Sequence, residues 1–120
     1  MLGRICVILS LAMLATTGAT AAASPQPSAG AAGHCRSAHY PGSGYFTSLS
    51  VRGTSCPTGR SVELAYYHCR LHHGKRGRCH SRVKGYSCHE KRTSIPTEID
   101  ARVTCRRGGA KVVHTYQQNT

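Results

Sequence analysis

Two stretches near the C-terminal end alternate between apolar and polar residues, which is the pattern of half-buried strands. In residues 100–106, every second residue from Ala101 to Cys105 can face a core while charged or polar residues face away. Residues 107–110 (Arg-Gly-Gly-Ala) have the composition of a hairpin turn, and residues 111–117 are rich in β-branched side chains. We therefore expect two antiparallel strands joined by a tight hairpin.

Two further strands are expected earlier in the chain. In residues 45–51 the odd-numbered positions, tyrosine, threonine, leucine and valine, fall on one side of an extended segment. Residues 83–92 form the next expected strand, with Tyr86 and Cys88 on one face. Residues 93–97 include a proline, so we expect the chain to turn there.

Between these strands, apolar residues recur at the spacing of one helical face. Positions i, i+3, i+4 and i+7 are occupied by Val62, Ala65, Tyr66 and Cys69. Ser55 is suited to cap the helix start, and Pro57 is tolerated in a first turn. Gly74 follows two histidines and can end the helix. We predict one helix over residues 56–72.

The predicted order of elements is β-α-β-β-β, which belongs to the α+β class. The simplest architecture places one helix on one face of a small antiparallel sheet. Residues 24–43 are rich in Pro, Ser, Gly and Ala and have no apolar periodicity, so we expect a flexible lead-in. The folded domain is then expected to span residues 44–120.

The first 23 residues have the features of an export signal. Arg4 supplies a positive charge, residues 5–14 are almost uninterruptedly apolar, and small residues follow. Cleavage after Ala21 or Ala23 is expected. The apolar run is shorter than the roughly 20 residues that span a bilayer, so we expect a secreted protein without a retained membrane anchor.

Removal of residues 1–23 would leave 97 residues and an even number of cysteines. An even set in a short exported chain is typical of a disulfide framework. The remaining chain has one Phe and no Trp, so disulfides are expected to supply stability that a small core cannot. The expected disulfide cysteines are Cys35, Cys56, Cys69, Cys79, Cys88 and Cys105.

The predicted helix limits how these cysteines can pair. Cys56 and Cys69 would lie about 20 Å apart along a helix axis, whereas a bridge needs Cα atoms within about 7 Å. They must therefore reach different partners. We expect Cys69 to pair with Cys79, and Cys56 with Cys88 or Cys105. Cys35 would take the remaining strand cysteine.

Several short segments resemble a group of small exported Cys-rich basic proteins of unknown function from high-GC bacteria. The segments are T-S-C-P-T-G-R-S-V-E-L-A-Y-Y-H-C, V-K-G-Y-S-C, I-D-A-R-V-T-C-R-R-G and V-V-H-T-Y, within residues 50–118. The resemblance implies the same helix-plus-sheet domain. It implies no activity and no functional residue.

Positive charge is the main indication of function. Beyond the predicted signal, 15 Lys and Arg residues face four acidic ones, so the formal net charge is +11. Such a surface attracts anionic polymers or cell-surface components. No sequence motif for reading nucleic acid is present. We predict a monomer that binds polyanions through two clusters: Arg70, Lys75, Arg76, Arg78, Arg82 and Lys84, and Arg102, Arg106, Arg107 and Lys111.

A histidine-based metal site is one alternative function. His68 and His72 are spaced to share one helix face, and His73 or His80 could complete a site for zinc or copper. The Cys-His pairs lack the spacing of a structural zinc site, and exported thiols tend to oxidise. These two points argue against a Cys/His site but leave a histidine-only site open. In the preferred interpretation these are ordinary surface histidines near a helix end, and we expect no metal or other cofactor.

A small secreted hydrolase, such as a nuclease, is the second alternative. It would need a general base and a general acid beside a cationic clamp. Glu90 with His114 is the pairing that remains, because His89 and Glu90 are neighbours on a strand and point to opposite faces. No nucleophile motif is present, so we predict no catalytic residue and a non-enzymatic role.

Overall fold

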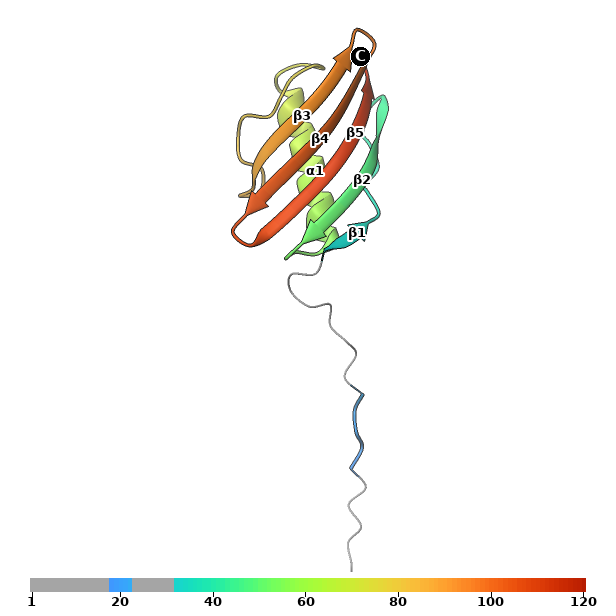
Figure 1. The fold of residues 1–120 in the computed structure, drawn as a ribbon, viewed down its shortest axis with the longest axis vertical. Coiled ribbons are helices and arrows are strands. Elements are labelled where there is room, and N and C mark those ends of the chain that lie inside the picture. Colours follow the sequence, from blue (N-terminus) through green and yellow to red (C-terminus); the bar gives the residue numbers. More distant parts are fainter. Residues whose placement is uncertain (1–17, 23–31) are drawn as a thin grey trace, which may run out of the picture.

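The computed structural model describes residues 18–22 and 32–120, and Figure 1 shows one helix lying against one face of a five-stranded sheet. The elements are β1 (Gly33–Cys35), β2 (Gly44–Arg52), α1 (Cys56–Leu71), β3 (Ser87–Ile95), β4 (Glu98–Arg107) and β5 (Ala110–Asn119). The strands lie in the order β1-β2-β5-β4-β3, and every neighbouring pair is antiparallel. This arrangement confirms the predicted α+β fold class and adds β1 to it.

Helix α1 begins and ends close to its predicted bounds. The Ser55 hydroxyl accepts the backbone N–H of Thr58 at 3.3 Å, and Pro57 lies in the first turn. The helix comes very close to β2 at Gly59, where a Cβ atom would lie 2.6 Å from Val51 Cγ1. Glycine at this position therefore sets the distance between the helix and the sheet.

Strand β4 confirms the alternation that predicted it. Its inward residues are buried beneath α1, and these are Ile99, Ala101, Val103 and Cys105. Residues 108 and 109 form the turn to β5, as the two glycines predicted. Strand β5 continues the core with Val112, His114 and Tyr116.

The predicted face of β2 is correct only in its second half. The pairing of β2 with β5 shifts between Phe46 and Ser48, which marks a β-bulge at Thr47. The bulge reverses the alternation, so Leu49 and Val51 are buried whereas Tyr45 is 54% exposed. Phe46 packs against the core in its place.

Strand β3 begins later than predicted. Val83 and Tyr86 form two reciprocal backbone hydrogen bonds of 3.0 and 2.8 Å, which close a tight turn before the strand. Lys84 and Gly85 occupy this turn with φ angles of 49° and 79°. A turn of this kind cannot continue as a strand, so the regular strand starts at Ser87.

The folded domain begins before Gly44, which corrects the predicted boundary. Strand β1 pairs with β2, and Tyr40 lies in the core between Phe46 and Tyr67, with ring centroids 4.8 and 4.9 Å away. At least residues 33–40 of the predicted flexible lead-in are therefore part of the fold. The composition of this segment gave no sign of this, because the segment is held by one disulfide, through Cys35, and by the ring of Tyr40.

All six predicted cysteines form disulfides, but the predicted pairing is only partly correct. Cys69 pairs with Cys79 as expected. Cys56 pairs with Cys35, not with a cysteine of the sheet's far strands, because β1 brings Cys35 to the start of α1. The remaining bridge joins Cys88 and Cys105, which face each other directly on β3 and β4.

Residues 1–17 and 23 of the predicted export signal lie outside the described residues, as do residues 24–31 of the predicted lead-in. Within residues 18–22 and 32–120, no helix has the length and apolar character needed to cross a membrane.

Glu63 connects α1 to the segment that follows β1. Its side chain is fully buried, and Oε2 accepts the backbone N–H of Ala38 at 2.9 Å. Oε1 has no hydrogen-bond partner within the described residues. Burial raises the pKa of Glu63 to about 7, although the N–H of Ala38 opposes this shift. The ionised carboxylate is therefore disfavoured in the folded state.

We predict that Glu63→Gln removes a pH dependence of stability. Because the pKa rises from 4.5 unfolded to about 7 folded, the stabilising contribution is complete below pH 4.5 and is lost as pH rises through 7. The free energy of unfolding of the wild type should fall by about 3 kcal/mol relative to the variant over this window. Urea denaturation at both ends of the window measures the difference, and parallel pH profiles would contradict it.

Candidate functional site

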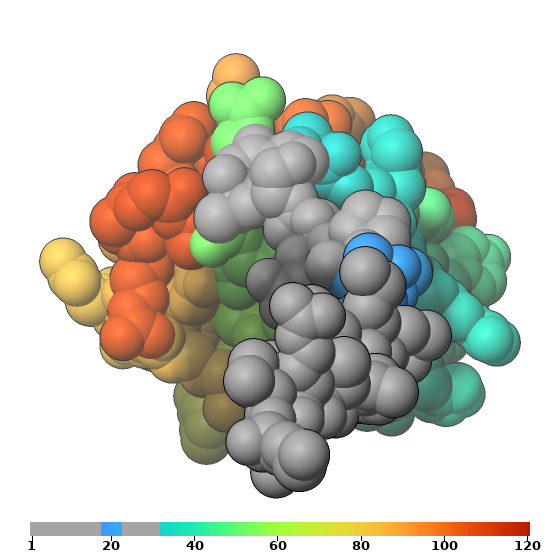
Figure 2. Space-filling model, turned by 90° about the horizontal axis from the view of Figure 1, so that it is seen from below, coloured from blue at the N-terminus to red at the C-terminus, as the bar shows by residue number. Residues whose placement is uncertain are grey.

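The ten predicted polyanion-binding residues do not form one patch. Arg76 donates to the carbonyl oxygens of Ile95 and Pro96 in the β3–β4 turn, whereas Arg107 donates to the carbonyl of Lys84 beside the β4–β5 hairpin. The segment between α1 and β3 thus runs from one end of the sheet to the other. Figure 2 looks at the hairpin end, where this yellow segment lies beside the orange-red hairpin.

Arg70 cannot contact an external polymer, which corrects its place in the predicted cluster. Its side chain is fully buried, and its guanidinium carbon lies 5.4 and 4.5 Å from the ring centroids of Tyr67 and Tyr116. Its N–H groups donate to the Tyr40 hydroxyl at 2.7 Å, to the Lys75 carbonyl at 3.2 Å and to the Gln118 side-chain oxygen. No carboxylate pairs with Arg70 within the described residues, so aromatic rings and neutral oxygens accommodate its charge.

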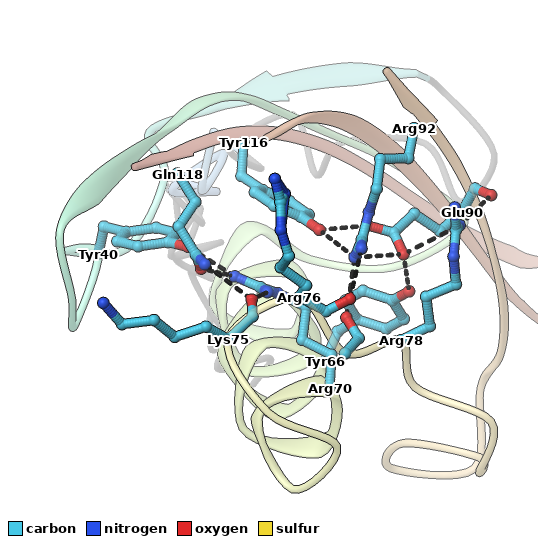
Figure 3. A network of polar contacts seen from close by, with 11 residues as sticks. Tyr40, Tyr66, Arg70, Lys75, Arg76, Arg78, Glu90, Arg92, Tyr116 and Gln118 are labelled. Carbon is cyan, nitrogen blue, oxygen red and sulfur yellow. Dashed lines mark hydrogen bonds and ion pairs between the residues drawn. The ribbon is translucent and has the colours of Figure 1, made fainter. Parts of the chain in front are cut away.

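Glu90 is the centre of a second group of buried polar side chains, shown with the first in Figure 3. Its carboxylate pairs with Arg92 at 3.1 Å, and the two side chains are 3% and 6% exposed. The hydroxyls of Tyr66, at 3.2 Å, and of Tyr116 also donate to it. Burial raises the pKa of both tyrosines, so they stay neutral donors. Arg78, whose side chain is more exposed than that of Arg92, also reaches the Glu90 carboxylate, at 3.5 Å.

These buried groups hold the segment after α1 in place. Arg92 donates to the carbonyls of Arg76 and Gly77 at 2.7 and 2.8 Å. The carbonyl of Lys75 accepts from Gln118 at 2.8 Å as well as from Arg70. Arg70, Glu90 and Arg92 therefore have a structural task, and they are poor candidates for binding a ligand.

The outer face of the sheet, opposite α1, presents five other cations, which we call the cationic face: Arg52, Lys91, Arg102, Arg106 and Lys111. Each of the five follows or precedes a buried or half-buried strand residue that points to α1, so its own side chain points away from the helix. Arg106 faces Lys111 across β4 and β5, and Lys111 faces Arg52 across β5 and β2. Lys91 likewise faces Arg102 across β3 and β4.

Like charges directly opposite each other on a sheet are destabilising. Within the described residues, none of the five side chains forms an ion pair. Across the strands, Arg52, Lys111 and Arg106 face one another and no carboxylate, so no ion pair offsets their mutual repulsion. Arg102, Arg106 and Lys111 were among the predicted binding residues, whereas Arg52 and Lys91 were missed. The alternation of β2 and β3 already placed them outward, but the sheet order was needed to bring them to the other three.

Two hollows lie on the cationic face. The larger, of about 450 Å³, has hydroxyl groups and charged side chains along it, chiefly Thr47, Thr93, Thr115, Lys91, Asp100 and Arg102. The smaller, of about 130 Å³, is lined by three cations, Arg52, Arg102 and Lys111, together with Ser50. Arg102 belongs to both hollows. This face can therefore hold an anionic group of a ligand beside a hydroxyl-rich group of the same ligand.

The residues of the predicted metal site and of the predicted hydrolase site lie outside the cationic face. His73 and His80 meet edge to face with ring centroids 5.5 Å apart, and His68 meets Tyr67 in the same way at 5.3 Å. Within residues 18–22 and 32–120, no group of three or more His, Cys, Asp or Glu side chains is arranged to hold a metal ion. His114 is fully buried between Phe46 and Tyr66 and cannot reach a substrate from its place in the core.

No protein-family model, no curated protein and no solved structure matches this chain. The resemblance to small exported proteins of high-GC bacteria stays a prediction.

Replacing Glu90 should destabilise the fold. In Glu90→Gln the buried guanidinium of Arg92 loses its only paired carboxylate within the described residues, which costs about 3 kcal/mol. Glu98→Gln makes the same chemical change at a half-buried position of β4 and should alter stability by less than about 0.5 kcal/mol. Urea denaturation of the two variants measures the difference. Equal effects would mean that the buried ion pair does not hold the loop.

His114→Phe should remove a source of acid sensitivity. Burial lowers the pKa of His114 from 6.5 to about 3, and neither ring nitrogen has a hydrogen-bond partner within the described residues. Because the folded pKa is depressed, the contribution of His114 is complete above pH 6.5 and is lost as pH falls toward 3. The wild type should lose about 2 kcal/mol relative to the variant between pH 7.5 and pH 5. A difference that does not change with pH would argue against a neutral buried imidazole.

Proposed function

We propose that the protein binds anionic polymers outside the cell through the cationic face. The observation that supports this most strongly is the alignment of Arg106, Lys111 and Arg52 on three adjacent strands, where no carboxylate of the described residues pairs with them. Such an arrangement costs folding stability, and a bound polyanion would remove that cost. Binding would also release the counterions of the polymer, which favours association at low salt.

The extracellular setting is supported by the disulfides. Three bridges in so short a chain are typical of an oxidising compartment. The predicted export signal points the same way. Anionic polymers in that setting include polymers of the cell surface and released nucleic acid.

A matched pair of triple variants tests the proposal. One carries Arg52→Gln, Arg106→Gln and Lys111→Gln and removes three charges from the cationic face. The control carries Arg36→Gln, Lys75→Gln and Arg82→Gln, which removes three exposed charges from other parts of the surface. The net charge of both variants is the same, so any difference reports on position.

The first variant should elute from a polyanion column at much lower salt than the control. For this variant, the logarithm of the binding constant should depend on the logarithm of the salt concentration with a slope that is less steep than that of the wild type by about 2. Each phosphate contact contributes about 0.7–0.9 to that slope, and three contacts are lost. At low salt the first variant should also be more stable than the wild type, by about 0.5 kcal/mol for each like-charge pair removed. Equal retention of both variants would show that net charge alone binds the polymer. Loss of stability would show that the three cations are structural.

A further inference from the structure

Asp100 is the one carboxylate that lines either hollow of the cationic face. It lies on β4, two residues from Arg102, and faces Thr93 on β3 and Gln117 on β5. The side chain is exposed, and it forms no hydrogen bond or ion pair within the described residues. A free carboxylate among cations weakens the attraction of this face for a uniformly charged polymer.

The two hollows differ in what they can hold. The smaller has three cations and no carboxylate, and its volume of about 130 Å³ suits one tetrahedral oxyanion with its nearest waters. The larger also has two cations of this face, Lys91 and Arg102, but it adds Asp100 and three threonine hydroxyls. The hydroxyl of Thr115 already lies 2.6 Å from those of Thr47 and Ser48. A carboxylate repels a phosphate but accepts hydrogen bonds from a hydroxylated unit.

We infer that the polymer bound here is a phosphodiester of a polyol or sugar. One phosphate would occupy the small hollow, held by Arg52, Arg102 and Lys111. The adjoining polyhydroxyl unit would occupy the large hollow and donate hydrogen bonds to Asp100. This inference rests on the proposed function, and it adds the chemical class of the polymer.

A polymer with bases on every unit fits this face less well. Stacking on aromatic side chains is a main source of affinity for single-stranded nucleic acids. Within the described residues, Tyr45 is the one exposed large aromatic side chain, and it faces Gln117 on β5, which also faces Asp100 on β4. The face therefore offers one stacking ring, not one for each unit of the polymer. The inference therefore commits to a base-free polymer, and RNA serves as a competing ligand in the test.

The test compares poly(ribitol phosphate), inorganic polyphosphate and a homopolymeric RNA of similar charge by titration calorimetry. The wild type should bind poly(ribitol phosphate) more tightly than the other two. Asp100→Asn should weaken binding of poly(ribitol phosphate) by about tenfold, because charge-assisted hydrogen bonds are replaced by neutral ones. The same variant should bind polyphosphate more tightly than the wild type, because a repulsive charge is gone.

Glu98→Gln is the matched control, since it removes one negative charge from β4 outside both hollows. It should strengthen binding of both phosphate polymers slightly. If Asp100→Asn also strengthens both, Asp100 acts only through net charge and the inference is wrong. Tighter binding of RNA than of poly(ribitol phosphate) would likewise overturn it.

The triple variant of the cationic face separates this inference from the proposed function. Suppose that the triple variant loses binding of all polymers while Asp100→Asn changes the affinity for each polymer by the same factor. The proposed function then holds and the inferred polymer class fails. If the wild type binds none of the three polymers, both are rejected.

Discussion

The buried pair of Glu90 and Arg92, with the tyrosines around it, is the interaction on which much of the structure depends. It lies where a larger domain would have apolar side chains, between the last turns of α1, the following loop and the sheet (Figure 3). Each partner is almost fully buried, so the pair is stable only because hydroxyls and backbone carbonyls complete its hydrogen bonds. Arg70 extends the same arrangement toward Gln118 and Tyr40.

This interior explains how a chain with few large apolar residues can fold. The helix start and β2 supply an apolar half, with Leu49, Val51 and Val62. The other half uses long side chains whose ends are polar. The bridges Cys69–Cys79 and Cys88–Cys105 link the end of α1, the following loop, β3 and β4, whereas Cys35–Cys56 links β1 to the helix start. Closing covalent loops stabilises such a fold mainly by restricting the unfolded chain.

Arginine has two different tasks in this protein. Arg70 on α1 and Arg92 on β3 point into the space between helix and sheet and fix a loop, whereas Arg102 and Arg106 on β4 point away from the helix. For the three strand residues the difference arises from alternation, because neighbouring residues of β3 and β4 point to opposite faces. Net charge therefore overstates the surface available to a polymer. The position of each cation, not the total, supports the proposed function.

Local patterns were sufficient for the helix, for β4 and for the hairpin after it, because caps, periodicity and turn residues act over a few neighbouring positions. The even number of cysteines beside a predicted export signal indicated that all six are bonded, and the single loop between Cys69 and Cys79 indicated that these two pair. The bulge in β2, the pairing of Cys35 with Cys56 and the alignment of Arg52 with Lys111 were decided by the tertiary structure. Each depends on which strand lies beside which, and such contacts between distant segments leave no periodic trace in either segment.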